Sequence, residues 1–463
     1  MKQTTKSLFT MLALAAVALA IGGVAYWAQK DEAKKTEAKE KSEKLFDFDK
    51  AHVKEVRIEK DGKVAVALSK GDKGWKLTQP VQGDADDTTV DTMLSQIANL
   101  KQKNDLADEK DLKAYGLDAP KLAVTLKLED GREQGLLVGV DNSFDNTLYV
   151  KRAGDATVRI VDAYAKSNFD RSAFELRDKR VAHLDDSAEV KRVEVSGVNS
   201  PYTLIKEGAA WKVGGQAADS SAADGVIRSL KNLRATSVAA ENSNNLKDFG
   251  LDKPKIVARL DARTVMIGQA KKPGSATLNT YAKRDDSPVV YEVDQQILKD
   301  LEKQPFDLQD KQLVHADREA VRELVFEGPS GVVRIARKKD APPDGGFADE
   351  TFMVTAPSAG AAKKWKISSA LYSITGLRAA AFDGPIPKDL AKYGLDKPKT
   401  ATLMGDGGKI LARIRLGAEK DGKRYVLADG LDKLARVEKA TVDDWPWTAA
   451  DALETPATPQ AAK

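Results

Sequence analysis

The sequence predicts an α+β protein with three tandem modules of mainly antiparallel sheet. The first observation is a phrase that occurs three times, at residues 115–120 (YGLDAP), 249–254 (FGLDKP) and 393–398 (YGLDKP). Its glycines lie 134 and 144 residues apart, which indicates a large repeated unit. The second observation is that each copy groups hairpin-like apolar runs around one or two helical patterns, and no strand-helix-strand alternation of the parallel kind is visible.

Length and composition set the outer limits. The chain has 463 residues, so three copies of about 135 residues match the commonest domain size. Hydrophobic residues make up 42% and charged residues 31%, which is typical of globular proteins. The formal net charge is only +4, and no basic stripe interleaved with aromatics occurs, so nucleic acid is not an expected partner. The absence of cysteine excludes disulfides, thiolate nucleophiles and cysteine-ligated metals.

The N-terminus predicts export. Residues 8–28 are uncharged and apolar, long enough as a helix to cross a bilayer core of about 30 Å. Lys2 and Lys6 favour a cytoplasmic location for residues 1–7. The small residues at 18–20 also fit a cleaved signal peptide, but the apolar run continues to Ala28, which favours an uncleaved signal-anchor. We therefore expect a single-pass inner-membrane protein whose bulk lies in the periplasm.

The remaining chain is divided as follows. A charged tether is predicted at 29–45, repeat modules at 46–178, 179–311 and 312–449, and a disordered tail at 450–463.

The first copy illustrates the elements expected in each module. Strands at 53–58 and 64–68 flank Asp61-Gly62, a hairpin signal. A Trp-Lys-apolar triplet follows and has apparent counterparts, so the sequence equates Trp75, Trp211 and Trp365. A helix is then predicted from residues with a period of 3.6: Val90, Met93, Leu94, Ile97 and Leu100. In the second copy, Ser221 and Asp224 suggest a capping box for this helix.

The repeated phrase predicts a helix ending. Its Gly suits the left-handed C′ position, and the following Leu would contact a Leu five residues earlier, as in a Schellman motif. Strands follow at 122–128 and at a Leu-Gly run, and a Tyr-containing strand comes next in each copy. Copies one and two close with similar phrases at 174–179 and 306–311. In copy three, residues 338–364 enlarge the early hairpin, and we expect this segment to be either disordered or a lid.

Chemical motifs are mostly missing, and we predict no catalytic residue, no cofactor site and no metal ligand. No dinucleotide, phosphate-loop, zinc-protease or nucleophile-elbow signature occurs. His183 and His315 occupy matching places after the closing phrases, beside Asp185 and Asp317; a third histidine is His52. A metal or general-base role is one interpretation, but metal sites need three or four converging ligands, so a linker position retained on duplication is favoured.

Three further groups of residues invite a functional interpretation. The repeated Asp118, Asp252 and Asp396 are better explained as turn-capping residues than as catalytic acids. The acidic cluster of Asp84, Asp86, Asp87 and Asp91 lacks the spacing of a calcium loop, and acidic residues favour a helix start. The three equated tryptophans could stack on a sugar, although tryptophans at strand spacing usually belong to a core.

The combination of the Trp-Lys-apolar triplet, the Gly-Leu-Asp-x-Pro phrase, the Leu-Gly strand end and the Tyr-Val strand resembles a bacterial family, domain of unknown function 4340, over residues 46–449. The resemblance implies a membrane-anchored envelope protein, often encoded beside ABC transporter components like those of gliding motility. It carries no established catalytic residues.

The expected function is a non-enzymatic accessory or protein-binding subunit of an ABC-type envelope transport system, with membrane proteins as partners and no small-molecule ligand identified. Enzymatic activity is left open. Two alternatives remain: a glycan-binding protein or hydrolase that uses a cleft between modules, and a structural spacer between membrane and wall. Buried tryptophans would favour protein binding, and exposed tryptophans would favour glycans.

Overall fold

The computed structural model describes residues 29–30, 43–107, 111–142, 144–184, 187–243, 245–270, 278–340 and 349–454. The chain divides into two compact units, one of residues 1–188, 230–255 and 263–297, and the other of residues 189–229, 256–262 and 298–463. The predicted anchor at 8–28 and most of the tether lie outside the described residues. Within the part that is described, no helix has the length and apolar character needed to cross a membrane.

Three groups of elements follow one another along the chain, and we call them modules 1, 2 and 3. Module 1 contains η1 (Lys50–His52), β1 (Val53–Lys60), β2 (Lys63–Gly71), β3 (Gly74–Gln79), β4 (Gly83–Asp84), α2 (Asp87–Ala98), β5 (Asn104–Leu106), β6 (Leu122–Leu128), β7 (Glu133–Asn142), β8 (Thr147–Arg152), β9 (Val158–Asp162), α3 (Ala165–Phe169) and α4 (Ala173–Leu176).

Module 2 repeats this series. It contains β10 (Arg192–Ser196), β11 (Tyr202–Glu207), β12 (Ala210–Val213), β13 (Gln216–Ala217), α5 (Ser220–Lys231), β14 (Ala235–Ala240), η2 (Leu246–Phe249), β15 (Ile256–Leu260), β16 (Arg263–Ala270), β17 (Asn279–Arg284), β18 (Val290–Asp294), α6 (Gln296–Leu301) and α7 (Pro305–Leu308).

Module 3 contains η3 (Arg318–Ala320), β19 (Glu323–Gly328), β20 (Gly331–Asp340), β21 (Asp349–Ala356), β22 (Gly360–Ala361), α8 (Lys364–Thr375), β23 (Ala381–Pro385), η4 (Ala391–Tyr393), β24 (Lys399–Met404), η5 (Asp406–Gly408), β25 (Ile410–Lys420), β26 (Lys423–Ala428), β27 (Lys433–Glu438), α9 (Lys439–Asp443) and α10 (Ala449–Ala452).

Each module forms one nine-stranded sheet, and the three sheets share one strand order. In module 1 the order is β4-β3-β2-β1-β6-β7-β8-β9-β5. Its paired strands are antiparallel, including the β1/β2 hairpin, in which Lys60 faces Lys63 across the Asp61-Gly62 turn. The predictions of tandem antiparallel modules and of this turn are confirmed.

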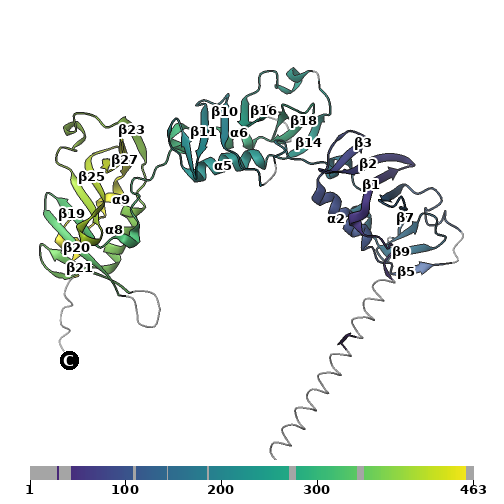
Figure 1. Cartoon of the computed structure of the whole chain (residues 1–463), viewed down its shortest axis with the longest axis horizontal. Coiled ribbons are helices and arrows are strands. Elements are labelled where there is room, and N and C mark those ends of the chain that lie inside the picture. The colour runs from purple at the N-terminus through teal and green to yellow at the C-terminus, as the bar shows by residue number, and fades with distance from the viewer. Residues whose placement is uncertain are drawn as a thin grey trace, which may run out of the picture. The chain divides into compact units, whose positions relative to one another are not determined.

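Each sheet buries one face against a helix of its own module, as Figure 1 shows for α2, α5 and α8. In β6, residues 122, 124, 126 and 128 are buried and alternate with half-buried residues. Helix α2 supplies Val90, Met93, Leu94 and Ile97 to the same core, each no more than 1% exposed. Burial of a side chain of this size contributes about 1.5–3 kcal/mol, so the helix and the inner sheet face stabilise each other.

The repeated phrase ends a helical turn as predicted. Gly116, Gly250 and Gly394 have φ values of 64°, 62° and 65°, which favour glycine. In module 1 the N–H of Leu117 donates to the carbonyl of Leu112 at 2.9 Å, and modules 2 and 3 repeat this bond. The Schellman prediction is therefore confirmed in all three copies.

The phrase also packs against strands far away in the sequence. Its aromatic residue meets the Tyr of the following strand edge-on, with ring centroids 4.7 Å apart for Tyr115 and Tyr149, and 5.1 and 5.0 Å in modules 2 and 3. The glycine of the Leu-Gly run lies against the same turn, because a Cβ on Gly139 or Gly417 would come within 2.2 or 2.1 Å of a carbonyl oxygen. These repeated motifs hold the fold together.

The alignment of the tryptophans was wrong for copy three. Trp75 and Trp211 lie on strands and are 3% and 4% exposed, but Trp365 lies in the first turn of α8 and is 70% exposed. Phe352 on β21 takes the buried place, since Ala362 donates to its carbonyl as Ala85 does to that of Trp75. The added residues lie earlier than the sequence alignment assumed, between β20 and β21, where 341–348 are outside the described residues.

Two helix boundaries also differ from expectation. Asp219, rather than Ser221, caps α5, because its carboxylate accepts the N–H of Ala222 at 3.1 Å. At the C-terminus, α10 continues to Ala452, which is fully buried, so ordered structure extends past the predicted boundary at 449. In copy three α10 takes the place of α4 and α7, because Leu453 bridges to Ala362 as Arg177 does to Ala85. Trp445 and Trp447 precede α10 and pack around Phe326.

Candidate functional site

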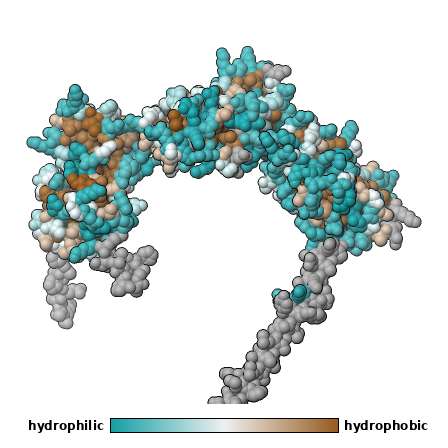
Figure 2. Space-filling model, in the orientation of Figure 1, coloured by the Kyte–Doolittle hydropathy of each residue, from teal (hydrophilic) through white to brown (hydrophobic). Residues whose placement is uncertain are grey.

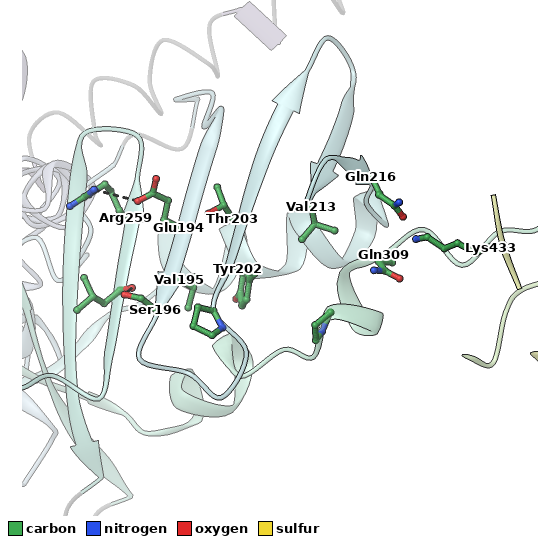
Figure 3. Close-up of a pocket in the computed structure, with 14 residues that line it drawn as sticks. Glu194, Val195, Ser196, Tyr202, Thr203, Val213, Gln216, Arg259, Gln309 and Lys433 are labelled. Carbon is green, nitrogen blue, oxygen red and sulfur yellow. Dashed lines mark hydrogen bonds and ion pairs between the residues drawn. The ribbon is translucent and has the colours of Figure 1, made fainter. Parts of the chain in front are cut away.

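A groove of about 940 Å³ crosses the outer face of the module 2 sheet, over β10, β11, β12 and β15 (Figure 3). Ser196 and Arg259 are exposed on this face and Thr203 is half-buried, while Pro305 of α7 borders the groove. Glu194 and Arg259 stand at one end of the groove, and Gln309 and Lys433 stand at the other. Figure 2 shows that the visible surface is mostly hydrophilic, with small hydrophobic patches.

The groove combines fixed charges with neutral hydrogen-bonding groups. Glu194 accepts from Arg259 at 3.3 Å and from Arg192 at 2.7 Å, so its carboxylate is fixed between two guanidinium groups. Ser196, Thr203 and Gln216 supply neutral donors and acceptors along the lining. Tyr202 also borders the groove, but its side chain is buried on the inner face, where its hydroxyl donates to the carbonyl of Leu301 at 3.0 Å; burial raises the pKa of this hydroxyl. The surface suits a polar chain with both donors and acceptors.

Module 3 has a smaller groove of about 410 Å³ on the corresponding face. It lies over β19, β20, β24 and β25, and three of these strands are the counterparts of β10, β11 and β15 in the shared strand order. The lining differs, because Val325, Arg334 and Thr402 replace Glu194, Thr203 and Arg259 in register. The position of the groove is repeated while its chemistry changes.

Two short segments follow the closing phrases, and we call residues 177–183 junction 1 and residues 309–315 junction 2. Their main chains are held alike. In junction 1 the N–H of Val181 donates to Leu233, and in junction 2 the N–H of Leu313 donates to Leu377, both at 2.9 Å. Val181 and Leu313 are buried, so each junction has an apolar anchor.

Junction 1 surrounds a buried carboxylate. The side chain of Asp178 is 4% exposed, and its oxygens lie 2.7 Å from Nδ1 of His183 and 2.9–3.2 Å from the guanidinium nitrogens of Arg180. Burial alone would raise the pKa of Asp178, but the hydrogen bonds from His183 and Arg180 outweigh it and hold that pKa well below its usual range. Nε2 of His183 lies 3.4 Å from the Asp84 carboxylate.

A cavity of about 320 Å³ adjoins this carboxylate. Arg177 lines it, is 4% exposed, and donates through Nη2 to Glu241 at 2.8 Å, whereas its buried Nη1 has no partner. Arg284 donates through Nε to Asp286, and Tyr291 completes this side. Burial lowers the pKa of Arg284, and repulsion from Arg263 lowers it further; burial raises the pKa of Tyr291.

Junction 2 is built differently. Gln309 and Gln312 replace the two arginines, and the amide nitrogen of Gln312 donates to the carbonyls of Val314 and Thr375 at 2.9 Å. The rings of Phe306 and Phe382 meet edge-on with centroids 5.7 Å apart. His315 is 70% exposed and lies 4.0 Å from Asp310.

The structure separates most of the residues that the sequence singled out. Asp86 caps α2 and Asp87 accepts the N–H of Trp75, while Asp84 and Asp91 face His183 and Lys50 respectively. Asp118, Asp252 and Asp396 are exposed. Over the described ranges, no group of three or more His, Asp or Glu side chains is arranged to hold a metal ion.

The three histidines have different surroundings. His183 contacts Asp178 and Asp84, while Asp185 lies outside the described residues. His52 pairs with Glu129 at 2.8 Å, a hydrogen bond that raises the pKa of the histidine. Hydrogen bonds from Lys54 and His52 lower the pKa of Glu129 to about 2.

Sequence reasoning missed Arg177, Glu241, Arg284 and Tyr291. One signal was available, because the two closing phrases differ where Arg177 is replaced by Gln309. The other three residues come from module 2 and have no motif of their own. Only the fold brings them to junction 1.

The fold defines a protein of three tandem antiparallel modules with grooves on repeated sheet faces. The model of the family described as domain of unknown function, DUF4340, matches residues 75–239, 211–344 and 353–459, and the chain belongs to this family. The matches begin on β3, at β12 and on β21, so the family unit is offset from the sheets. Comparison with curated proteins and with solved structures found no match.

Proposed function

We propose that this chain is a membrane-anchored protein of the periplasm that binds other proteins through the outer faces of its sheets. The observation that carries the proposal is the recurrence of a groove over corresponding strands in modules 2 and 3. If a module served only to form a stable core, its sequence would have to maintain only the inner face of the sheet. A groove kept in position but changed in chemistry fits a repeat that binds different segments of a partner.

The proposed occupant is an extended polypeptide segment. The module 2 groove offers neutral donors and acceptors between a fixed ion pair at one end and Lys433 at the other. Such a lining complements a backbone with both N–H and C=O groups. The family resemblance and residues 8–28 extend the proposal to an accessory subunit of an ABC-type envelope transport system in the inner membrane.

The test is a crosslinking pull-down from detergent-solubilised membranes. The baits are the full-length chain, the chain lacking residues 1–45, and a Thr203→Arg variant. The longer arginine side chain of this variant would occupy the module 2 groove. Thr92→Arg on the exposed side of α2 is the matched control. We expect the full-length chain and the control to recover transporter subunits and Thr203→Arg to lose them. Equal recovery by all baits, or recovery of peptidoglycan alone, would contradict the proposal.

One observation favours glycan binding as a second candidate. Trp365 and Tyr372 lie two turns apart on α8 and are 70% and 69% exposed. Aromatic rings presented in this way can stack on sugars. Retention of peptidoglycan fragments by the wild-type chain, and their loss in Trp365→Ala, would support this candidate.

A further inference from the structure

We propose that the cavity at junction 1 binds a small oxyanion, a phosphate or carboxylate group, through Arg177, Arg284 and Tyr291. The site is separate from the sheet grooves and does not depend on the function proposed for them. Its volume of about 320 Å³ is at the lower end of the range for small-molecule sites.

The first argument is that strong donors remain unused. Nη1 of Arg177 is buried without a hydrogen-bond partner. Within the described part of the chain, Arg284 forms a hydrogen bond only through Nε, so its Nη1 and Nη2 remain for a ligand. A buried charged group with an unused donor is costly, and an oxyanion would satisfy it.

The second argument is that the carboxylates around the cavity already have partners. Asp178 accepts from Arg180 and His183. Glu241 accepts from Arg177, and Asp286 is shared by Arg284 and Arg263. Because the acids and bases nearly balance, binding would depend on the geometry of the remaining donors. A guanidinium fork matches a carboxylate or phosphate in this way.

The third argument comes from the repeat. Around junction 2, the counterparts of Arg177, Arg284 and Tyr291 are Gln309, Ala428 and Ala435, as the strand registers show. Junction 2 nevertheless keeps the same main-chain bonds as junction 1. The module fold therefore does not require the three polar side chains, and a ligand gives them a role.

The test is equilibrium dialysis of the full-length chain in detergent against radiolabelled inorganic phosphate and, separately, radiolabelled acetate. We expect saturable binding of one anion per chain. The anion that binds more tightly shows whether the site takes a phosphate or a carboxylate group. Arg284→Gln should weaken binding about tenfold or more, and Arg284→Lys should restore part of it. Arg436→Gln removes an ion-paired arginine from module 3 and should change nothing.

Tyr291→Phe serves as a second variant, because it removes only a hydroxyl and keeps the ring. It should weaken binding about threefold or more even if Arg284→Gln loosens the junction. Equal binding by wild type and all variants would mean an adventitious ion only. That result, or the lack of saturable binding of both anions, would overturn the proposal.

Discussion

Junctions 1 and 2 occupy the same place in the repeat but are stabilised by different side chains. The main-chain bonds match: Asp178 donates to Asp84 at 2.9 Å, and Asp310 donates to Ala217 at 3.0 Å. Around this common scaffold, junction 1 gathers ionised groups about the buried Asp178, and junction 2 gathers aromatic rings and amides beside the ion pair of Arg378 with Asp219.

The difference shows which features belong to the fold and which belong to a site. Apolar anchors and main-chain bonds recur because each module needs them to close. The arginines do not recur, so their burial has a cost without a requirement from the fold. The predictions below separate the shared part of the junctions from the part that differs, and hydrogen exchange is the readout because a multi-module chain does not unfold in one step.

The largest effect is expected at the shared anchors. Leu313→Ala removes a side chain that is 4% exposed and should destabilise junction 2 by about 2–4 kcal/mol. Val181→Ala should destabilise junction 1 by somewhat less, because valine loses one carbon fewer than leucine. Hydrogen exchange of residues 308–316 and 176–184 measures both. A large effect in only one junction would contradict the idea of a common scaffold.

Loss of the buried carboxylate should distinguish the junctions. Asp178→Asn removes the negative charge and one of the two acceptor oxygens that Arg180 and His183 contact, and should destabilise junction 1 by about 2–3 kcal/mol. Asp310→Asn is the matched control and should cost less than about 1 kcal/mol, because His315 lies 4.0 Å away and is exposed. Faster exchange in residues 176–184 for the first variant alone is the expected result; equal changes would remove the distinction.

Acid should open junction 1. The pKa of Asp178 is lowered in the folded chain, so its contribution is fully present above the unfolded pKa of about 3.9 and is lost as pH falls below that value. Exchange protection of residues 176–184 should therefore decrease on acidification below about pH 4. Asp178→Asn should remove this pH dependence. A variant with the same acid response as wild type would show that another group is responsible.

Loss of an aromatic ring should destabilise junction 2 more than junction 1. Phe382→Ala removes the edge-on contact with Phe306 and the cation–π contact with Lys433, and should destabilise junction 2 by about 1–2 kcal/mol. Val238→Ala, at the corresponding position of module 2, should cost less than about 1 kcal/mol. The comparison uses exchange in residues 308–316 and 176–184. A larger effect of Val238→Ala would mean that junction 1 is the more apolar.

The smallest effect is expected for His183 and His315, which occupy matching positions in the two junctions. His183→Gln loses the short contact with Asp178 and should weaken junction 1 by about 1 kcal/mol. His315→Gln should stay within about 0.5 kcal/mol of wild type because its ring is 70% exposed. Hydrogen exchange of residues 176–184 and 308–316 measures both variants, and faster exchange in 308–316 for His315→Gln would contradict this expectation.

Part of the fold was predictable because it depends on residues close together in the chain. The Gly-Leu-Asp-x-Pro phrase specifies its own turn through Gly116 and the bond from Leu117 to Leu112. The hairpin at Asp61-Gly62 is local in the same sense. The helix core of Val90 to Ile97 follows from its period, since residues three and four apart share one face.

Sequence reasoning failed where similar residue triplets lie in different elements of the fold. The Trp-Lys-Ile triplet of copy three resembled the strand triplets of copies one and two, yet Trp365 begins α8 and Phe352 fills the core. A local match cannot show where an inserted segment begins. The buried position of Phe352 became visible only when β21 paired with β20.

By itself, the sequence determined the threefold repeat, the turn that ends a helix in each copy and the antiparallel character of the modules, because periodicity and turn chemistry are properties of neighbouring residues. The tertiary structure alone decided which side chains meet. Arg177, Glu241 and Arg284 are separated by 64 and 43 positions in the chain but line one cavity. Strand order and module closure bring them together, and neither can be inferred from short-range patterns.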